Sequence, residues 1–147
     1  MGFGEAIKVC FNKYVDFSGR ARRSEYWWFY LFCILVNLVL GWIPIVGFII
    51  SLGLLLPSLA ALIRRLHDIN RSGWWCLGFY GVMILGMAVG GTILASGAEA
   101  LGVGIMVLSV IAVIVWSIVW LASDGTPGPN RFGEDPKGRM DVEEVFS

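Results

Sequence analysis

Arginine is the residue type in this sequence whose spacing most strongly suggests a binding chemistry. Two short segments hold six arginines: Arg20, Arg22, Arg23, Arg64, Arg65 and Arg71. Each guanidinium group presents N–H donors in a planar fork that matches the oxygens of a phosphate. Basic pockets at the cytoplasmic ends of membrane helices bind anionic lipid headgroups with this chemistry. The two segments therefore predict an anion site, provided that the fold brings them to one place.

Tryptophan pairs follow both arginine segments, as Trp27–Trp28 and Trp74–Trp75. Indole rings are amphipathic and settle at the depth of the lipid headgroups. We call the six arginines and these four tryptophans the Arg/Trp collar, and we interpret it as a site for anionic lipid. The general alternative is that the arginines only set the membrane topology and the tryptophans only form an aromatic belt.

The same segments carry four other polar residues with a suggested role: Asp16, Glu25, His67 and Asp68. Glu25 suits the positive end of a helix that begins nearby, and Asp68 could neutralise an arginine one turn away. Three carboxylates against six arginines leave an expected excess of three positive charges on the collar.

Catalysis and metal binding have weak support in the sequence. His67 is the only histidine, and it does not face the adjacent Asp68 if both lie on a helix. The cysteines Cys10, Cys33 and Cys76 are an odd number without metal-site spacing, which indicates small apolar side chains. We therefore predict no metal, no cofactor and no enzyme, with a lipid-modifying enzyme using His67 and Asp68 as the weakest alternative.

The composition of the chain indicates which kind of helices must position the collar. Of 147 residues, 57% are hydrophobic and only 15% are charged, with 11 basic and 11 acidic residues. This balance gives no reason to expect a nucleic-acid partner, and it excludes an ordinary soluble domain. Three uncharged runs cover 26–63, 72–98 and 100–123. Each exceeds the roughly 20 residues that a helix needs to cross the hydrocarbon core.

The runs predict an all-α membrane protein with four transmembrane helices arranged as two hairpins. The first run is nearly twice the needed length, and the turn sequence at 41–44 divides it. The expected helices are 26–42, 45–63, 74–95 and 101–122. They form a transmembrane domain over 26–122, preceded by a cytoplasmic segment over 1–25 and followed by a cytoplasmic tail over 123–147, rich in proline and glycine and then acidic.

Basic residues set the expected orientation in the bacterial inner membrane. All 11 lie before the first span, between the second and third, or after the fourth, so both termini are predicted to be cytoplasmic. Residues 1–25 contain no apolar core of a signal peptide. Apolar residues there share one helical face, which predicts an amphipathic helix at the membrane interface; a short helix packed on the cytoplasmic loops is the alternative. The face consists of Phe3, Ile7, Cys10, Phe11 and Tyr14.

Small residues on the third expected helix bear on assembly. Gly86 and Gly90 form a pair four residues apart that permits close helix contact, either within the chain or between copies in a homo-oligomer. None of the four spans holds an Asp, Glu, Lys, Arg or His residue, which argues against ion-coupled transport. An oligomeric passive transporter or channel subunit stays open as an alternative function.

Three motifs give the chain a family resemblance. They are DFSGRARRSEYWW at 16–28, RRLHDINRSGWW at 64–75 and GTPGPNRFGEDP at 125–136. In this order they resemble the bacterial inner-membrane family catalogued as Domain of Unknown Function 805. The resemblance implies a small multi-pass inner-membrane protein and transfers no activity. We therefore expect a structural, lipid-binding or partner-binding role through the collar, with membrane lipids as the main partners.

Overall fold

The computed structural model describes residues 1–139 of the chain, and this part contains five α-helices and no β-strand. The helices are α1 (Phe3–Asn12), α2 (Arg23–Leu40), α3 (Pro44–Asp68), α4 (Trp75–Ala95) and α5 (Glu99–Ala122). The all-α prediction is confirmed. The tail over 123–139 is irregular, as its prolines and glycines predict. Of the acidic part of the tail, Asp141, Glu143 and Glu144 lie outside the described residues.

Three helices are long and apolar enough to cross a membrane, namely α3, α4 and α5. The fourth predicted span, α2, does not meet this criterion. It begins earlier than predicted, at Arg23, and its first turn holds the charged Glu25 before a run of amphipathic aromatic residues. The last part of the first motif, from Arg23 on, is thus helical, and it lowers the apolar content of the 18-residue helix.

α3 extends further than its apolar run. It was expected to end at Ile63, but it continues through Arg64 and Arg65 to Asp68. A helix of 25 residues is about 37 Å long, longer than the hydrocarbon core of about 30 Å. About 20 residues from Pro44 reach Ile63, so the charged last turn lies beyond the apolar length. The helix continues through these charged residues because Arg64 and Arg65 form buried ion pairs.

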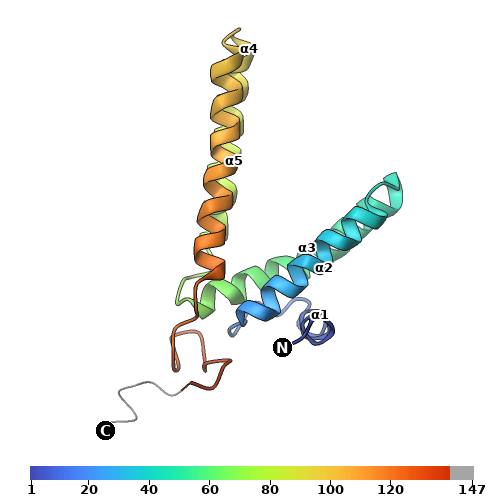
Figure 1. The fold of residues 1–147 in the computed structure, drawn as a ribbon, viewed down its shortest axis with the longest axis vertical. Coiled ribbons are helices and arrows are strands. Elements are labelled where there is room, and N and C mark those ends of the chain that lie inside the picture. The colour runs from blue at the N-terminus through green and yellow to red at the C-terminus, as the bar shows by residue number, and fades with distance from the viewer. Residues whose placement is uncertain (140–147) are drawn as a thin grey trace. The chain divides into compact units, whose positions relative to one another are not determined.

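The chain divides into two compact units. One comprises Met1–Gly73 with the described residues from Asp124 on, and the other is Trp74–Ser123. Within each unit two helices run side by side in opposite directions, α2 with α3 and α4 with α5 (Figure 1). The segments predicted as cytoplasmic flanks, before α2 and after α5, belong to the same unit as α2 and α3.

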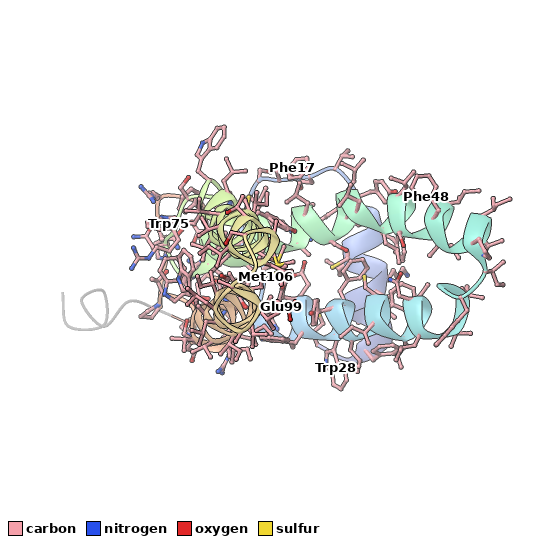
Figure 2. The ribbon with its side chains drawn as sticks, turned by 90° about the horizontal axis from the view of Figure 1, so that it is seen from above. Phe17, Trp28, Phe48, Trp75, Glu99 and Met106 are labelled. Atoms are coloured by element: carbon pink, nitrogen blue, oxygen red, sulfur yellow. The ribbon has the colours of Figure 1, made fainter. Side chains whose placement is uncertain are left out.

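The short helix α1 packs across α2 and α3. It crosses them near the middle of the pair, while Trp28 and Phe48 point outward on opposite sides of the unit (Figure 2). Phe11 of α1 meets the rings of Phe29 and Phe32 edge-on, with centroids 5.7 and 5.9 Å apart. Ala6 and Cys10 of α1 are fully buried. The amphipathic character of α1 is thus used for packing on its own hairpin; its place at a membrane interface stays a prediction.

α4 and α5 contact each other through small residues. A Cβ added at Gly90 would lie 2.5 Å from Cγ of Met106 and 2.7 Å from the carbonyl oxygen of Gly102. A Cβ at Gly86 would overlap the hydroxyl of Ser109. Both glycines therefore face α5 of the same chain. This is the packing within the chain that the sequence analysis gave as one alternative. A homo-oligomer through the same helix stays a prediction.

Candidate functional site

Two groups of buried ion pairs lie at the end of α3. The first joins Arg64 to Glu25 of the first turn of α2, with Nη2 3.0 Å from Oε1. Arg64 is fully buried and Glu25 is 3% exposed. Nη1 of Arg64 also donates to the carbonyl oxygens of Lys13 and Asp16, at 3.2 and 2.8 Å. One guanidinium therefore ties α3 to α2 and to the segment after α1.

The second group centres on Asp68. Its Oδ1 accepts from Nε of Arg20 at 3.0 Å, and its Oδ2 accepts from Nη1 of Arg65 at 2.5 Å. All three side chains are at most 2% exposed. Asp68 was expected to neutralise one arginine and instead neutralises two. Arg20 reaches it from the segment before α2, whose Ala21 N–H donates to the carbonyl of Arg64 at 3.0 Å.

The tail folds onto this group and completes it. Arg20 donates from Nη2 to the carbonyl of Thr126 at 2.5 Å and from Nη1 to that of Gly128 at 2.7 Å. Thr126 N–H donates to the Asp68 carbonyl at 2.9 Å, and Asn130 Nδ2 donates to the His67 carbonyl at 2.9 Å. The last carbonyls of α3, which have no partner within a helix, are thus capped by the tail.

A carboxylate of the tail, Asp135, holds the tail's own fold. It accepts from Nε of Arg139 at 2.8 Å and lies 3.9 Å from Arg20. Burial opposes ionisation of Asp135, but hydrogen bonds from Arg139 and from the backbone N–H groups of Lys137 and Gly128 lower its pKa to about 2. Asp135 is therefore a fixed negative charge at any physiological pH.

The buried charges balance. Six ionisable side chains of the cluster are buried: Arg20, Arg64, Arg65, Glu25, Asp68 and Asp135. Three cations against three anions leave a formal charge of zero, in place of the excess of three that the collar alone predicted. Buried ions are tolerated only when they are paired and hydrogen-bonded. We call these six residues the buried ion cluster; its arginines do not offer a free cation to an external phosphate.

Other parts of the collar lie at the surface. Arg71 is exposed, and Arg23 keeps 45% of its side chain exposed beside Asp124, 3.7 Å away. Arg22 is half-buried and donates from Nε to the Pro136 carbonyl at 2.6 Å. The structure thus divides the predicted arginines into a buried group and a solvent-accessible group.

The collar tryptophans also differ in exposure. Trp28 is 40% exposed and packs edge-on against Phe3, while Trp27 is half-buried among Tyr26 and Tyr30. In the other unit Trp74 is 78% and Trp75 41% exposed. Surface indoles of this kind are compatible with an aromatic belt and with lipid contact.

The remaining predicted polar residues have local roles. Asp16 is exposed and accepts from the hydroxyl and N–H of Ser18, which hold its pKa below the ordinary value. Nδ1 of His67 lies 3.0 Å from the Gly19 carbonyl, so this nitrogen is the donor. The His67 ring stacks on Phe132 with centroids 3.9 Å apart. His67 and Asp68 thus have separate partners, as adjacent helical residues should.

The thiol nearest the cluster is not reactive in this setting. Cys10 lies 3.9 Å from both Glu25 and Arg64. Burial, together with the negative charge of Glu25, raises the pKa of the Cys10 thiol to about 12. It is therefore protonated at neutral pH and lacks the thiolate that nucleophilic chemistry requires. No group of three or more metal-ligating side chains occurs among residues 1–139.

The contacts of the tail with the Asp68 group were not predicted from the sequence. Asp135, Thr126 and Asn130 were read only as part of a turn-rich segment that ends α5. The third motif could have predicted this role, because it combines turn residues with polar side chains. It is also one of the three motifs on which the family resemblance rests. Lys137 and Arg139 likewise pair with Asp124 and Asp135.

Fold and site together define a class: an α-helical membrane protein whose polar segments meet in a neutral cluster at the end of a membrane-length helix. The chain belongs to the family described as Protein of unknown function (DUF805), which matches residues 14–134. The resemblance inferred from the three motifs is confirmed, and the matched range contains five of the six residues of the buried ion cluster outright and ends one residue before Asp135.

Two relatives from Escherichia coli strain K12 are similar over most of their length. Inner membrane protein YhaI is 38% identical over 134 residues, which cover 86% of this chain and 90% of the relative. Inner membrane protein YhaH is 36% identical over 145 residues, covering 89% of this chain and 94% of the relative. No solved structure matches the chain significantly. The family therefore supports an inner-membrane protein and states no activity.

Proposed function

We propose that this protein is a non-enzymatic component of the inner membrane that binds anionic phospholipid through the exposed part of its collar. The buried ion cluster has a different task, which is to hold the cytoplasmic segments in a fixed arrangement. The observation that carries this division is the burial of Arg64 and Arg65 at 0% exposure beside the exposed Arg71 of the same motif.

Orientation supports the proposal. Contacts of Asp68 with Arg20 and Thr126 bring the segment before α2, the end of α3 and the tail to one location. These segments hold all basic residues of the chain except Lys8 and Lys13, which flank them in sequence. Positive charge concentrates on the cytoplasmic side of inner-membrane proteins. We therefore infer that the N-terminal segment and the tail face the cytoplasm.

Exposed arginines at such a surface have a physical reason to bind lipid. Each basic residue close to an anionic leaflet contributes about 1 kcal/mol of attraction, and a guanidinium can contact a phosphate through two N–H groups. Trp74 follows Arg71 by three residues in the sequence, in the order of cation and tryptophan that defines the collar. The candidate ligand is a phospholipid with a net negative headgroup.

A matched pair of substitutions tests the proposal. Arg71→Gln and Arg65→Gln remove the same charge from the same motif and differ in burial. We expect Arg71→Gln to lower the phosphatidylglycerol or cardiolipin retained in native mass spectrometry while the melting temperature stays close to wild type. Arg65→Gln should lower the melting temperature, because Asp68 loses one of its two cations.

Charge-conserving Arg71→Lys separates simple attraction from bidentate contact, since only the latter requires the guanidinium. Unchanged retention of anionic lipid by Arg71→Gln and by Arg23→Gln would show that the exposed arginines act as topology signals alone, and the lipid-binding proposal would then be wrong.

A further inference from the structure

The polar ends of α2 and α3 lie at one level. Ala21 N–H, just before α2, donates to the carbonyl of Arg64 near the end of α3 at 3.0 Å. The Arg64–Glu25 ion pair, also 3.0 Å, joins the same ends. The two helices run in opposite directions from there to a short turn at 41–43. Consequently both helices cross the membrane or neither does, although only α3 has the composition of a span.

The contacts of α1 fix where it crosses the α2/α3 pair. Its Phe11 contacts Phe29 and Phe32 of α2, and Tyr14, just after α1, donates from its hydroxyl to the carbonyl of Gly53 in α3. Beyond these contacts α2 continues from Phe32 to Leu40 and α3 reaches back from Gly53 to Pro44. At 1.5 Å per residue, the pair extends only about 12–14 Å past α1. Figure 2 shows α1 crossing the pair.

That distance is less than half of the hydrocarbon core, which is about 30 Å thick. If the turn at 41–43 reached the far boundary of the membrane, α1 would lie near the bilayer centre. The exposed side of α1 carries Glu5, Lys8 and Asn12. Charged residues are strongly disfavoured at the bilayer centre. With α1 at the cytoplasmic boundary instead, these side chains reach water and the turn lies near the midplane.

The turn itself suits an apolar environment. Trp42 is 82% exposed, yet its indole Nε1 donates to the Leu38 carbonyl at 2.6 Å. Gly41 N–H donates to the Asn37 carbonyl at 2.8 Å, and Ile43 N–H donates to the Leu40 carbonyl at 3.2 Å. Backbone groups inside the bilayer must find such internal partners, because no water is available.

Side chains around this turn are apolar on every exposed side. The residues from Leu38 to Ile49 that expose large apolar side chains are Leu38, Val39, Trp42, Ile43, Ile45, Val46, Phe48 and Ile49. The turn between α4 and α5 differs, because it holds Ser96 and leads directly into the charged Glu99. Of these two turns, the one between α4 and α5 carries the polar groups expected of a loop that emerges into water.

We propose that α2 and α3 form a re-entrant hairpin, which enters from the cytoplasmic side and inserts its turn among the acyl chains of the cytoplasmic leaflet, with α1 lying along the boundary of that leaflet. The four expected crossings then become two, by α4 and α5. Both arrangements leave every basic residue on the cytoplasmic side, so the positive-inside pattern fits either one.

Cysteine accessibility in the full-length protein in cells tests the hairpin. The native Cys10, Cys33 and Cys76 are replaced by alanine, and single cysteines are introduced at two positions. Ile45→Cys lies at an exposed position in the first turn of α3, directly after the hairpin turn, and Ala98→Cys lies in the turn between α4 and α5. A membrane-impermeant maleimide is applied to intact cells and, separately, after permeabilisation. Ser18→Cys, at an exposed cytoplasmic position, provides the control that reacts only after permeabilisation.

We expect Ala98→Cys to react in intact cells and Ile45→Cys to react under neither condition. A nitroxide at position 45 should then be relaxed by oxygen and protected from a water-soluble nickel chelate, as at the bilayer interior. Reaction of Ile45→Cys in intact cells at the rate of Ala98→Cys would show a spanning pair. Its reaction only after permeabilisation would place the turn in the cytoplasm, and either result overturns the proposal.

Discussion

Replacing Glu25 with leucine is expected to leave Arg64 as an unpaired charge inside the protein. Arg64 has no exposed surface, and its 3.0 Å partner Glu25 is 3% exposed, so solvent cannot compensate for the missing carboxylate. Removing one member of such a buried pair costs about 3–5 kcal/mol of folding free energy. We expect the lower part of this range, because Arg64 keeps its hydrogen bonds to the carbonyls of Lys13 and Asp16.

The reverse change, Arg64→Met, is expected to cost more. It leaves Glu25 buried without its cation, and it also removes both carbonyl hydrogen bonds, each worth about 1 kcal/mol. The double variant Glu25→Leu/Arg64→Met has no buried charge at this position and loses only the two hydrogen bonds. It should therefore be destabilised by about 2 kcal/mol, well below the combined effect of the single changes.

Unfolding in mixed micelles of dodecyl maltoside and SDS, followed by circular dichroism, measures these differences. The two single changes together are expected to cost at least about 6 kcal/mol and the double variant about 2 kcal/mol. The expected coupling between the two positions is therefore at least about 4 kcal/mol, above the usual range for residues in contact. Single variants within about 0.5 kcal/mol of wild type, the range of ordinary surface changes, would refute the assignment of this pair to the interior. Additive effects in the double variant would refute the pairing itself.

Three further predictions concern the tail and the second helix pair. Gly90→Ala should destabilise the α4–α5 pair by about 1–3 kcal/mol, because its Cβ would lie 2.5 Å from Met106, whereas Gly91→Ala, with nothing within 4 Å, should be neutral or slightly stabilising in the same unfolding assay. Asp135 has a lowered pKa, so its ionised form stabilises the folded protein above the ordinary carboxyl pKa of about 4, and this contribution is lost as the pH falls towards about 2. The difference in melting temperature between wild type and Asp135→Asn should therefore shrink over that interval, and a constant difference would contradict the role of Asp135. Gly125→Ala places a Cβ against the Asp68 carboxylate, 2.7 Å from Oδ1, and should release the tail. Trypsin should then cleave after Arg131, whereas the substitution Glu134→Ala, at an exposed position, should leave cleavage unchanged.

Hydropathy and charge predicted the helices better than they predicted the contacts of the buried ion cluster. The expected helices at 74–95 and 101–122 agree closely with α4 and α5, because uninterrupted apolar runs define their ends. The start of α2 was misplaced by three residues and the end of α3 by five, since both helices extend into charged sequence. A charged residue ends an uncharged run in the sequence. It does not end the helix when its side chain forms a buried ion pair.

The cluster shows what pattern alone cannot provide. The structure joins the two arginine segments through Arg20 and Asp68. Arg20 is also satisfied by the carbonyls of Thr126 and Gly128, more than a hundred residues away. Backbone acceptors have no signature in the sequence. Asp135 looked like one more acidic residue of a tail, although it supplies the third carboxylate that makes the buried ion cluster neutral.

Arginine-selective labelling of the wild-type protein in native membranes tests the central claim, that the collar divides into buried and exposed arginines. Phenylglyoxal modification followed by peptide mass spectrometry reports the reactivity of each guanidinium. The structure predicts rapid modification of the exposed Arg71 and Arg131, and protection of Arg20, Arg64 and Arg65 until the protein is unfolded. Modification of Arg64 and Arg65 at the rate of Arg71 would contradict the buried ion cluster and return all six arginines to the membrane surface.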